Sequence, residues 1–98
     1  IQEKGSFTLI SGVVSDDPIF GGVIASTVDR AIEAFAMAAA IELPKGLRIN
    51  VISPNLLTES EAKYGAFFPG FDRVDGEKVA SAYVKSILGA NTGKTYKV

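Results

Sequence analysis

The sequence predicts an α/β fold in which helices cover a parallel sheet. Segments with the patterns of strands and helices alternate along the 98 residues. A long amphipathic helix turns back through Pro44-Lys45-Gly46 into a strand rich in Ile and Val, and such a return is typical of parallel sheets. Apolar residues make up 47% of the chain, which favours a packed core over disorder.

The first half of the chain contains one strand and one long helix. We expect a strand over residues 6–11, because Phe7-Thr8-Leu9-Ile10 is apolar and β-prone. A loop follows at Ser15-Asp16-Asp17-Pro18, where Asp and Pro are typical of turns. The pattern then predicts a helix over residues 22–43, which Pro44 ends. Its apolar positions recur in steps of three and four: Val28, Ile32, Phe35, Ala39 and Leu43.

The second half returns to the sheet twice. Its predicted segments are a buried strand over 47–53, a helical turn over 59–64, an apolar loop over 67–71, a helix over 75–88 capped by Asp75, and a last strand over 95–98. Parallel strands joined through helices in this order are expected to have right-handed crossovers.

The first predicted strand begins almost at the start of the sequence. In a sheet built only from these segments its outer edge would have no partner, and natural sheets cover such edges. The sequence therefore predicts the back half of a doubly wound domain, so that residues 1–98 form a single partial domain. The missing N-terminal half is its first expected partner.

Composition excludes several classes of function. Ten basic and eleven acidic residues nearly cancel, and no run of Lys or Arg occurs, so neither nucleic acid nor a membrane is an expected partner. The chain has no Cys and no His, so we expect no disulfide and no metal site. Charges interrupt every long apolar run, and we expect a soluble, cytoplasmic protein.

Three segments resemble the short-chain dehydrogenase/reductase family. Residues 5–12 resemble the fifth strand of that family, residues 25–35 resemble its active-site helix, and residues 43–54 resemble the return to its sixth strand. The resemblance covers nearly the whole chain and implies the C-terminal half of a Rossmann-type domain. It also implies NAD or NADP as cofactor, with the main binding half, including the family's Gly-rich turn, outside these residues.

The family's catalytic residues do not match this sequence. Its active-site helix begins with Tyr-x-x-x-Lys, and alignment on Glu33-Ala34-Phe35 places Ala25 at the Tyr and Asp29 at the Lys. Counting back places Gly12 at the catalytic Ser. Alanine and glycine carry no acid or hydroxyl group, and a carboxylate at position 29 would raise the pKa of a phenol instead of lowering it.

Two serines lie next to the lost catalytic positions. Ser11 precedes Gly12, and Ser26 follows Ala25, so each is a candidate substitute. A shift of one residue on a strand turns a side chain to the other face, which disfavours Ser11. The competing interpretation is that both are structural serines bonded to backbone.

The resemblance implies a cofactor contact in the segment after the second long strand. In the family a Pro-Gly begins the loop that packs on the nicotinamide, and here Pro54 is followed by Asn55. Leu57 and Thr58 lie in the same loop, so we expect cofactor contacts from Pro54, Asn55, Leu57 and Thr58. Open α/β sheets bind ligands beyond the carboxyl ends of their strands, and residues 12–20 and 64–71 are expected to shape a substrate pocket there.

Two functional hypotheses follow from the resemblance. The first is a part of an NAD(P)-dependent oxidoreductase with an atypical or lost catalytic set, acting on a small-molecule carbonyl or alcohol. The alternative is a non-catalytic NAD(P)-binding sensor or scaffold protein, and a purely structural fragment comes third. Small residues at Ala36, Ala39 and Ala40 would permit close helix packing, and the family's use of this helix implies a homo-oligomer.

Overall fold

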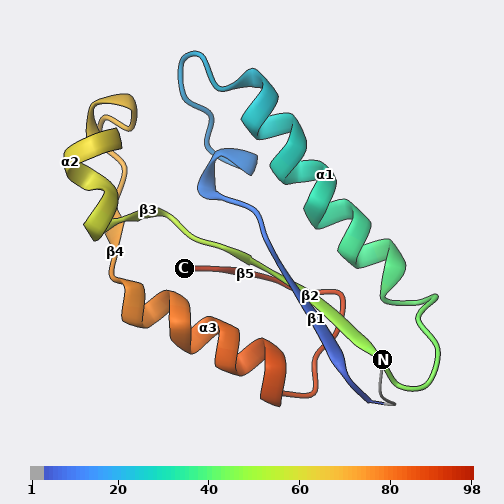
Figure 1. Ribbon diagram of the computed structural model, residues 1–98. Helices are drawn as coiled ribbons and strands as arrows, with labels where there is room; N and C mark the ends of the chain where they lie inside the picture. The colour runs from blue at the N-terminus through green and yellow to red at the C-terminus, as the bar shows by residue number, and fades with distance from the viewer. Residues whose placement is uncertain (1–3) are drawn as a thin grey trace.

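The computed structural model describes residues 4–98, in which a three-stranded parallel sheet lies between two long helices (Figure 1). Strands β1 (Ser6–Ile10), β2 (Arg48–Ser53) and β5 (Thr95–Lys97) are hydrogen-bonded in that order. Helix α1 (Val23–Ala39) joins β1 to β2, and helix α3 (Gly76–Leu88) precedes β5. The prediction of an α/β fold with a parallel sheet is confirmed. None of the helices in residues 4–98 is long and apolar enough to cross a membrane.

Strand β2 lies at the centre of the sheet and is its most buried part. Val51 and Ile52 are both 0% exposed, as expected for a strand that is covered on both faces. Strand β1 lies at one edge, where Phe7 is 38% and Ile10 is 51% exposed. Within residues 4–98 no further strand pairs with the outer side of β1.

Apolar side chains join α1 to the sheet. Ala36, Ile49 and Val51 form a buried cluster, against which Leu9 and Ile32 pack. Ala36 is 1% exposed, and its small side chain lets the helix approach the strands closely. The predicted helical period matches burial only in part: Ile32, Ala39 and Leu43 pack on the core, whereas Val28 and Phe35 are 50% and 60% exposed. The buried side of α1 is centred on Glu33 and Ala36 instead.

Polar side chains join α3 to the opposite face. Arg48 donates from Nη1 to the carbonyl of Ser86 (2.7 Å) and from Nη2 to the next carbonyl along α3 (2.6 Å). The Thr8 and Ser86 hydroxyls share a hydrogen bond of 2.7 Å. Asn50, 0% exposed, donates from its side chain to the carbonyl of Asn91 (2.9 Å). These bonds satisfy buried polar groups and the last carbonyls of the helix.

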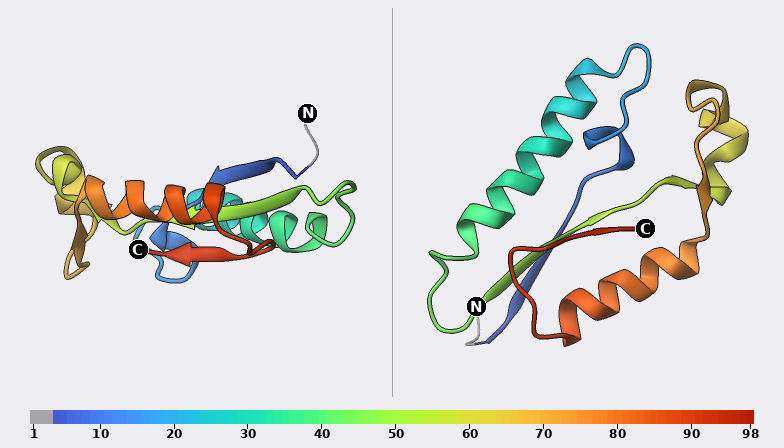
Figure 2. Two further views of the ribbon diagram at one scale, coloured as in Figure 1. Left: turned by 90° about the horizontal axis from the view of Figure 1, so that it is seen from below. Right: turned by 180° about the vertical axis from the view of Figure 1, so that it is seen from behind.

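The two helices lie on opposite faces of the sheet, and this overturns one expectation. Leu9 packs toward α1 whereas Thr8 bonds to α3. The strands are parallel, and the chain adds them across the sheet in the order β1, β2, β5. Two crossovers that run across the sheet in the same direction but over opposite faces therefore have opposite hands. Figure 2 shows that the connection from β2 through α3 to β5 is the left-handed one. The expectation of right-handed crossovers is wrong here, since residues 54–75 form a long connection that carries the chain past the sheet before α3 begins.

That connection contains a small second sheet and three short helices. Strands β3 (Leu56–Leu57) and β4 (Arg73–Val74) pair in parallel. Between them lie the 3-10 helix η2 (Thr58–Ser60), helix α2 (Glu61–Tyr64) and the 3-10 helix η3 (Gly65–Phe67). We call residues 58–71 the flap. The predicted helical turn over 59–64 is confirmed, and the predicted loop over 67–71 begins inside η3.

Two further boundaries differ from the predictions. Helix α1 ends at Ala39, because the chain then tightens into a turn in which Glu42 N donates to the carbonyl of Ala39 (2.9 Å). Pro44 therefore follows the helix at a distance and does not end it. Asp75 occupies the N-cap position of α3, but its side chain makes no cap bond and instead accepts the Thr58 hydroxyl (2.9 Å).

Candidate functional site

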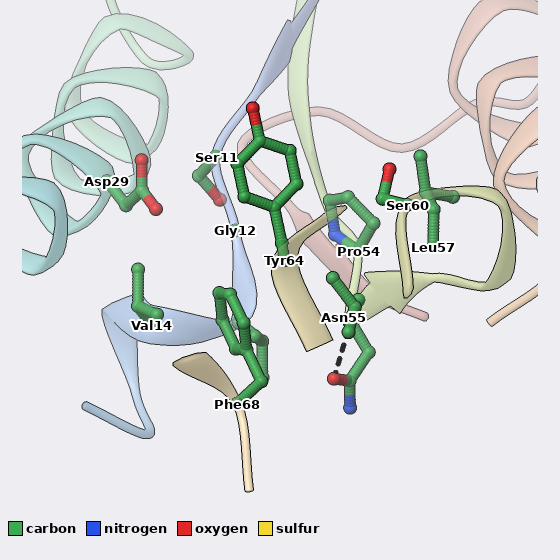
Figure 3. A pocket seen from close by; sticks show the side chains of 12 residues that line it. Ser11, Gly12, Val14, Asp29, Pro54, Asn55, Leu57, Ser60, Tyr64 and Phe68 are labelled. Carbon is green, nitrogen blue, oxygen red and sulfur yellow. Dashed lines mark hydrogen bonds between the residues drawn. The ribbon is translucent and has the colours of Figure 1, made fainter. Parts of the chain in front are cut away.

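A cavity of about 310 Å³ lies beyond the carboxyl ends of β1 and β2 (Figure 3). The turn after β1, which includes the 3-10 helix η1 (Val13–Ser15), contributes one wall. Helix α1, the segment after β2 and the flap contribute the others. The lining residues are Ser11, Gly12, Val13, Val14, Asp29, Pro54, Asn55, Leu56, Leu57, Ser60, Tyr64 and Phe68. The cavity thus lies where parallel α/β sheets bind ligands.

Gly12 leaves room for the carboxyl group of Asp29. A Cβ atom at position 12 would lie 2.9 Å from Oδ2 of Asp29, which is closer than such atoms approach one another. A side chain at position 12 would therefore displace the Asp29 carboxyl. Two of the three residues that differ from the family's catalytic set are thus linked by sterics, and the Asp29 carboxyl occupies space beside the end of β1 (Figure 3).

The surroundings of the Asp29 carboxyl group oppose its negative charge. Partial burial raises the pKa of the Asp29 carboxyl above its usual range, and the negative charge of Glu33 one turn along α1 raises it further. No ion pair within residues 4–98 involves Asp29. Among residues 4–98, Asp29 alone places a carboxyl group in the lining of the cavity, and no Lys or Arg of these residues forms an ion pair with it.

Ser11 is held by a buried carboxylate. Its hydroxyl donates to Oε2 of Glu33 (2.7 Å), and Glu33 is only 8% exposed. Lys97 of β5 donates to Oε1 of Glu33 (3.4 Å) and also pairs with Asp16 (2.5 Å), which in turn pairs with Arg30 (3.1 Å). Burial alone would raise the pKa of Glu33, but hydrogen bonds from serines and from Lys97 lower it overall. The network fixes the turn after β1 against the middle of α1 and the end of β5.

The structure brings most of the predicted site residues together. Gly12, Asp29 and Ser11 line the cavity from one side, and Pro54 with Asn55 line it from the other. Leu57, the third predicted cofactor contact, lines it as well.

Three predicted positions lie outside the lining. Thr58 is exposed, and its hydroxyl is engaged by Asp75. Ala25 is exposed on the first turns of α1, and the hydroxyl of Ser26 is buried with no hydrogen-bond partner in the described part of the chain. These positions are therefore less directly placed for chemistry in the cavity than Asp29 is.

A second, larger cavity of about 610 Å³ lies between the loop after η1 and the flap. It is lined by Pro18, Ile19, Phe20, Gly21, Ala66, Phe67, Pro69 and Phe71. None of these side chains is charged, and Phe20 is fully exposed. Both segments that the sequence assigned to a substrate pocket thus line cavities.

Two residues of the site were not singled out from the sequence. Glu33 served only as an alignment mark, although its place one helical turn after Asp29 puts it on the same face of the helix. Tyr64 is followed four residues on by Phe68 and not by Lys, so the family pattern does not mark it, yet it lines the cavity. Residues 4–98 contain no group of three or more His, Cys, Asp or Glu side chains that could hold a metal ion.

Solved structures with the same architecture as this chain are known. The protein lin1944 from Listeria innocua is 50% identical over 99% of this chain, with a TM-score of 0.97, and 48% of its own length is covered. A small-chain dehydrogenase is 28% identical over the whole chain, with a TM-score of 0.81 and 48% of its length covered. The chain has part of the short-chain dehydrogenase/reductase fold.

Another solved structure of that fold contains a cofactor. It is a small-chain dehydrogenase in complex with NADPH, 26% identical over the whole chain, with a TM-score of 0.81 and 51% of its length covered. The chain thus spans about half the length of each of these three proteins. No family model matches the chain, and no curated protein does.

Proposed function

We propose that this chain belongs to an NAD(P)-dependent oxidoreductase of the short-chain dehydrogenase/reductase kind with an atypical catalytic set. The observation that carries the proposal is the cavity at the carboxyl ends of β1 and β2. Position 12, position 29 and the segment after Pro54 line it together, and these are the positions that the family resemblance links to chemistry and cofactor contact. The complex of a similar dehydrogenase with NADPH supports the choice of cofactor.

The cavity suits the nicotinamide end of such a cofactor. Its volume of about 310 Å³ is at the lower end of ligand pockets, so it accommodates one ring-sized group and not a whole dinucleotide. Pro54, Asn55 and Leu57 would hold the ring on one side, and Ser11 and Asp29 lie on the other. When bound, the cofactor supplies hydride chemistry, and the N-terminal half of the domain would hold its adenosine and pyrophosphate.

The alternative is a protein that binds the cofactor without turnover. Ala25 at the family's Tyr position is exposed and carries no acid, and Gly12 carries no hydroxyl. A sensor or scaffold of this kind would retain the fold and an oligomer interface. Ala36, Ala39 and Ala40 pack against the core of this chain, so the expectation that they pack on a partner is not met. Val28 and Phe35, seven residues apart on one side of α1, are 50% and 60% exposed, and we assign this side of α1 to that interface.

The test is NADPH binding to the natural full-length gene product, measured by calorimetry. We expect saturable binding, which Leu57→Glu weakens by tenfold or more because it places a charge in the cavity lining. Val84→Glu is the matched control, since Val84 is exposed on α3 outside the cavity. Absence of NADPH and NADH binding would refute the proposal. Oxidation of bound NADPH by added aldehydes or ketones would favour the enzyme, and binding without oxidation would favour the alternative.

A further inference from the structure

The cavity at the carboxyl ends of β1 and β2 has the chemistry of a site for an organic cation. Its lining has one carboxyl group, from Asp29, and two aromatic rings, from Tyr64 and Phe68 (Figure 3). No Lys or Arg of residues 4–98 belongs to that lining. Aromatic faces attract cations through the ring quadrupole, and a half-buried carboxylate adds a direct charge interaction.

The cations near the cavity are already engaged elsewhere. Lys97 pairs with Glu33 and Asp16, and Arg30 also pairs with Asp16. On the flap, Nζ of Lys63 lies 5.2 Å from the centroid of the Tyr64 ring, so it competes for that ring but is not part of the lining. None of these groups neutralises Asp29, and the negative charge of Glu33 adds to that of Asp29.

We propose that this cavity binds a cationic aromatic ring in preference to its neutral counterpart, with Asp29 as the charge-selecting residue. This inference rests on the proposed function, which makes the ring an oxidised nicotinamide. That ring carries a positive charge that the reduced ring lacks. Asp29 stands where the family pattern has a lysine, so the charge at this place is the opposite of the charge in the family pattern. The cavity therefore favours the oxidised cofactor over the reduced one.

Small probes test the cavity without the rest of a dinucleotide. We would measure binding of the 1-methylnicotinamide cation and of neutral 1-methyl-1,4-dihydronicotinamide to the natural full-length protein by NMR at mildly alkaline pH. The two probes have almost the same size and differ in charge. We expect the cation to bind about three- to tenfold more tightly. Equal affinities, or no binding of either probe at millimolar concentration, would overturn the inference.

Matched variants assign the preference to one side chain. Asp29→Asn keeps the shape of the side chain and removes its charge, so the preference for the cation is expected to disappear. Asp17→Asn removes an exposed carboxylate outside the cavity lining and is expected to leave the preference unchanged. A preference that survives in Asp29→Asn would assign the selectivity to another group.

A second measurement is independent of any variant. Glu33 is the charged group that acts on Asp29, whereas Arg30 and Lys97 pair with Asp16 and Lys63 lies over the Tyr64 ring. A bound cation favours the ionised form of Asp29, so 1-methylnicotinamide should lower the pKa of that carboxyl in a ¹³C NMR titration. An unchanged pKa at saturating probe would contradict the inference.

Whole dinucleotides separate this inference from the proposed function. NADP⁺ and NADPH differ in the charge of the nicotinamide ring, and we expect NADP⁺ to bind more tightly to the wild type than to Asp29→Asn, with NADPH little changed. If both dinucleotides bind with a ratio that Asp29→Asn does not alter, the proposed function stands and the inference fails. If the small cation is preferred but neither dinucleotide binds, the inference stands and the proposed function fails.

Discussion

On the side of β2 that faces α1, Ile49 and Val51 pack against Ala36, whereas on the side that faces α3, Arg48 and Asn50 bond to backbone groups. Both sides are buried, but one is held by apolar contact and the other by directed hydrogen bonds. The hydrophobic effect has no preferred direction, whereas a hydrogen bond weakens steeply when its angle changes. The polar side therefore fixes where α3 lies, on the face opposite to the one that the usual crossover rule favours.

The largest expected effect comes from the apolar side. Ile49→Ala removes most of a side chain that is 4% exposed and leaves a cavity, so we expect a loss of about 2–5 kcal/mol in the free energy of unfolding. Ile49→Val should cost only about 0.5–1.5 kcal/mol. Urea denaturation measures both changes. A loss below about 1 kcal/mol for Ile49→Ala would show that this side is loosely packed.

The polar side is tested by Asn50→Ala. The change leaves the carbonyl of Asn91 and the amide of Lys94 without the partners they have at 2.9 Å and 3.0 Å, so we expect a loss of about 1–3 kcal/mol. Asn91→Ala is the control, because it keeps the Asn91 carbonyl and removes only an exposed side chain. If the two variants are equally stable in urea, the Asn50 bonds do not hold the α3 side.

A smaller effect is expected at the contact between β1 and α3. Thr8→Val and Ser86→Ala each remove one hydroxyl of a 2.7 Å pair, and a double-mutant cycle should give a coupling of about 0.5–1.5 kcal/mol. The control cycle combines Thr8→Val with Val84→Ala, a change on the exposed side of α3, and it should show no coupling. A coupling near zero for Thr8 and Ser86 would mean that water replaces the bond without cost.

The smallest expected effects are changes in how stability depends on pH. The pKa of Glu33 is lowered in the folded protein, so its stabilisation is present above the unfolded value of 4.5 and is lost as pH falls through the folded pKa. The pKa of Asp29 is raised, so stability falls as pH rises from the unfolded value of 3.8 through the folded pKa.

Two variants separate these opposite contributions. Glu33→Gln should flatten the loss of stability on the acid side, and Asp29→Asn should remove the decline that accompanies rising pH. Thermal melting across the acid range measures both. A steeper acid loss in Glu33→Gln than in the wild type would contradict the assigned role of Glu33.

The sequence predicted what depends on local pattern. Leu9 and Ile32 lie in the strand and the helix that local pattern predicts, and both pack on the α1 side of the sheet. Ala36 was expected at a partner interface and is buried against the sheet instead. The hand of the second crossover could not be predicted, because a long connection over residues 54–75 separates β2 from α3, and the bonds from Arg48 and Asn50 on the α3 side reach residues about forty positions away. No local rule links residues at such separations.

For the candidate site, the sequence positions were predictable but the contacts between their side chains were not. Gly12, Asp29 and Pro54 follow from alignment to a family pattern, and the carboxyl ends of parallel strands bring them to one place. The steric link between Gly12 and Asp29 and the bond from Ser11 to Glu33 depend on how α1 crosses the end of β1. Side-chain placement of this kind requires coordinates.

The bond between Thr8 and Ser86 spans 78 residues, and this has a consequence for the order in which the protein acquires its structure. During synthesis β1 can pair with β2 only once about the first half of the chain has emerged, and the α3 face of both strands stays uncovered until the second half follows. Contacts so distant in sequence make folding slow and leave this face of both strands uncovered for longer. A nascent chain is therefore most prone to aggregate in the interval before α3 covers the second face of the sheet.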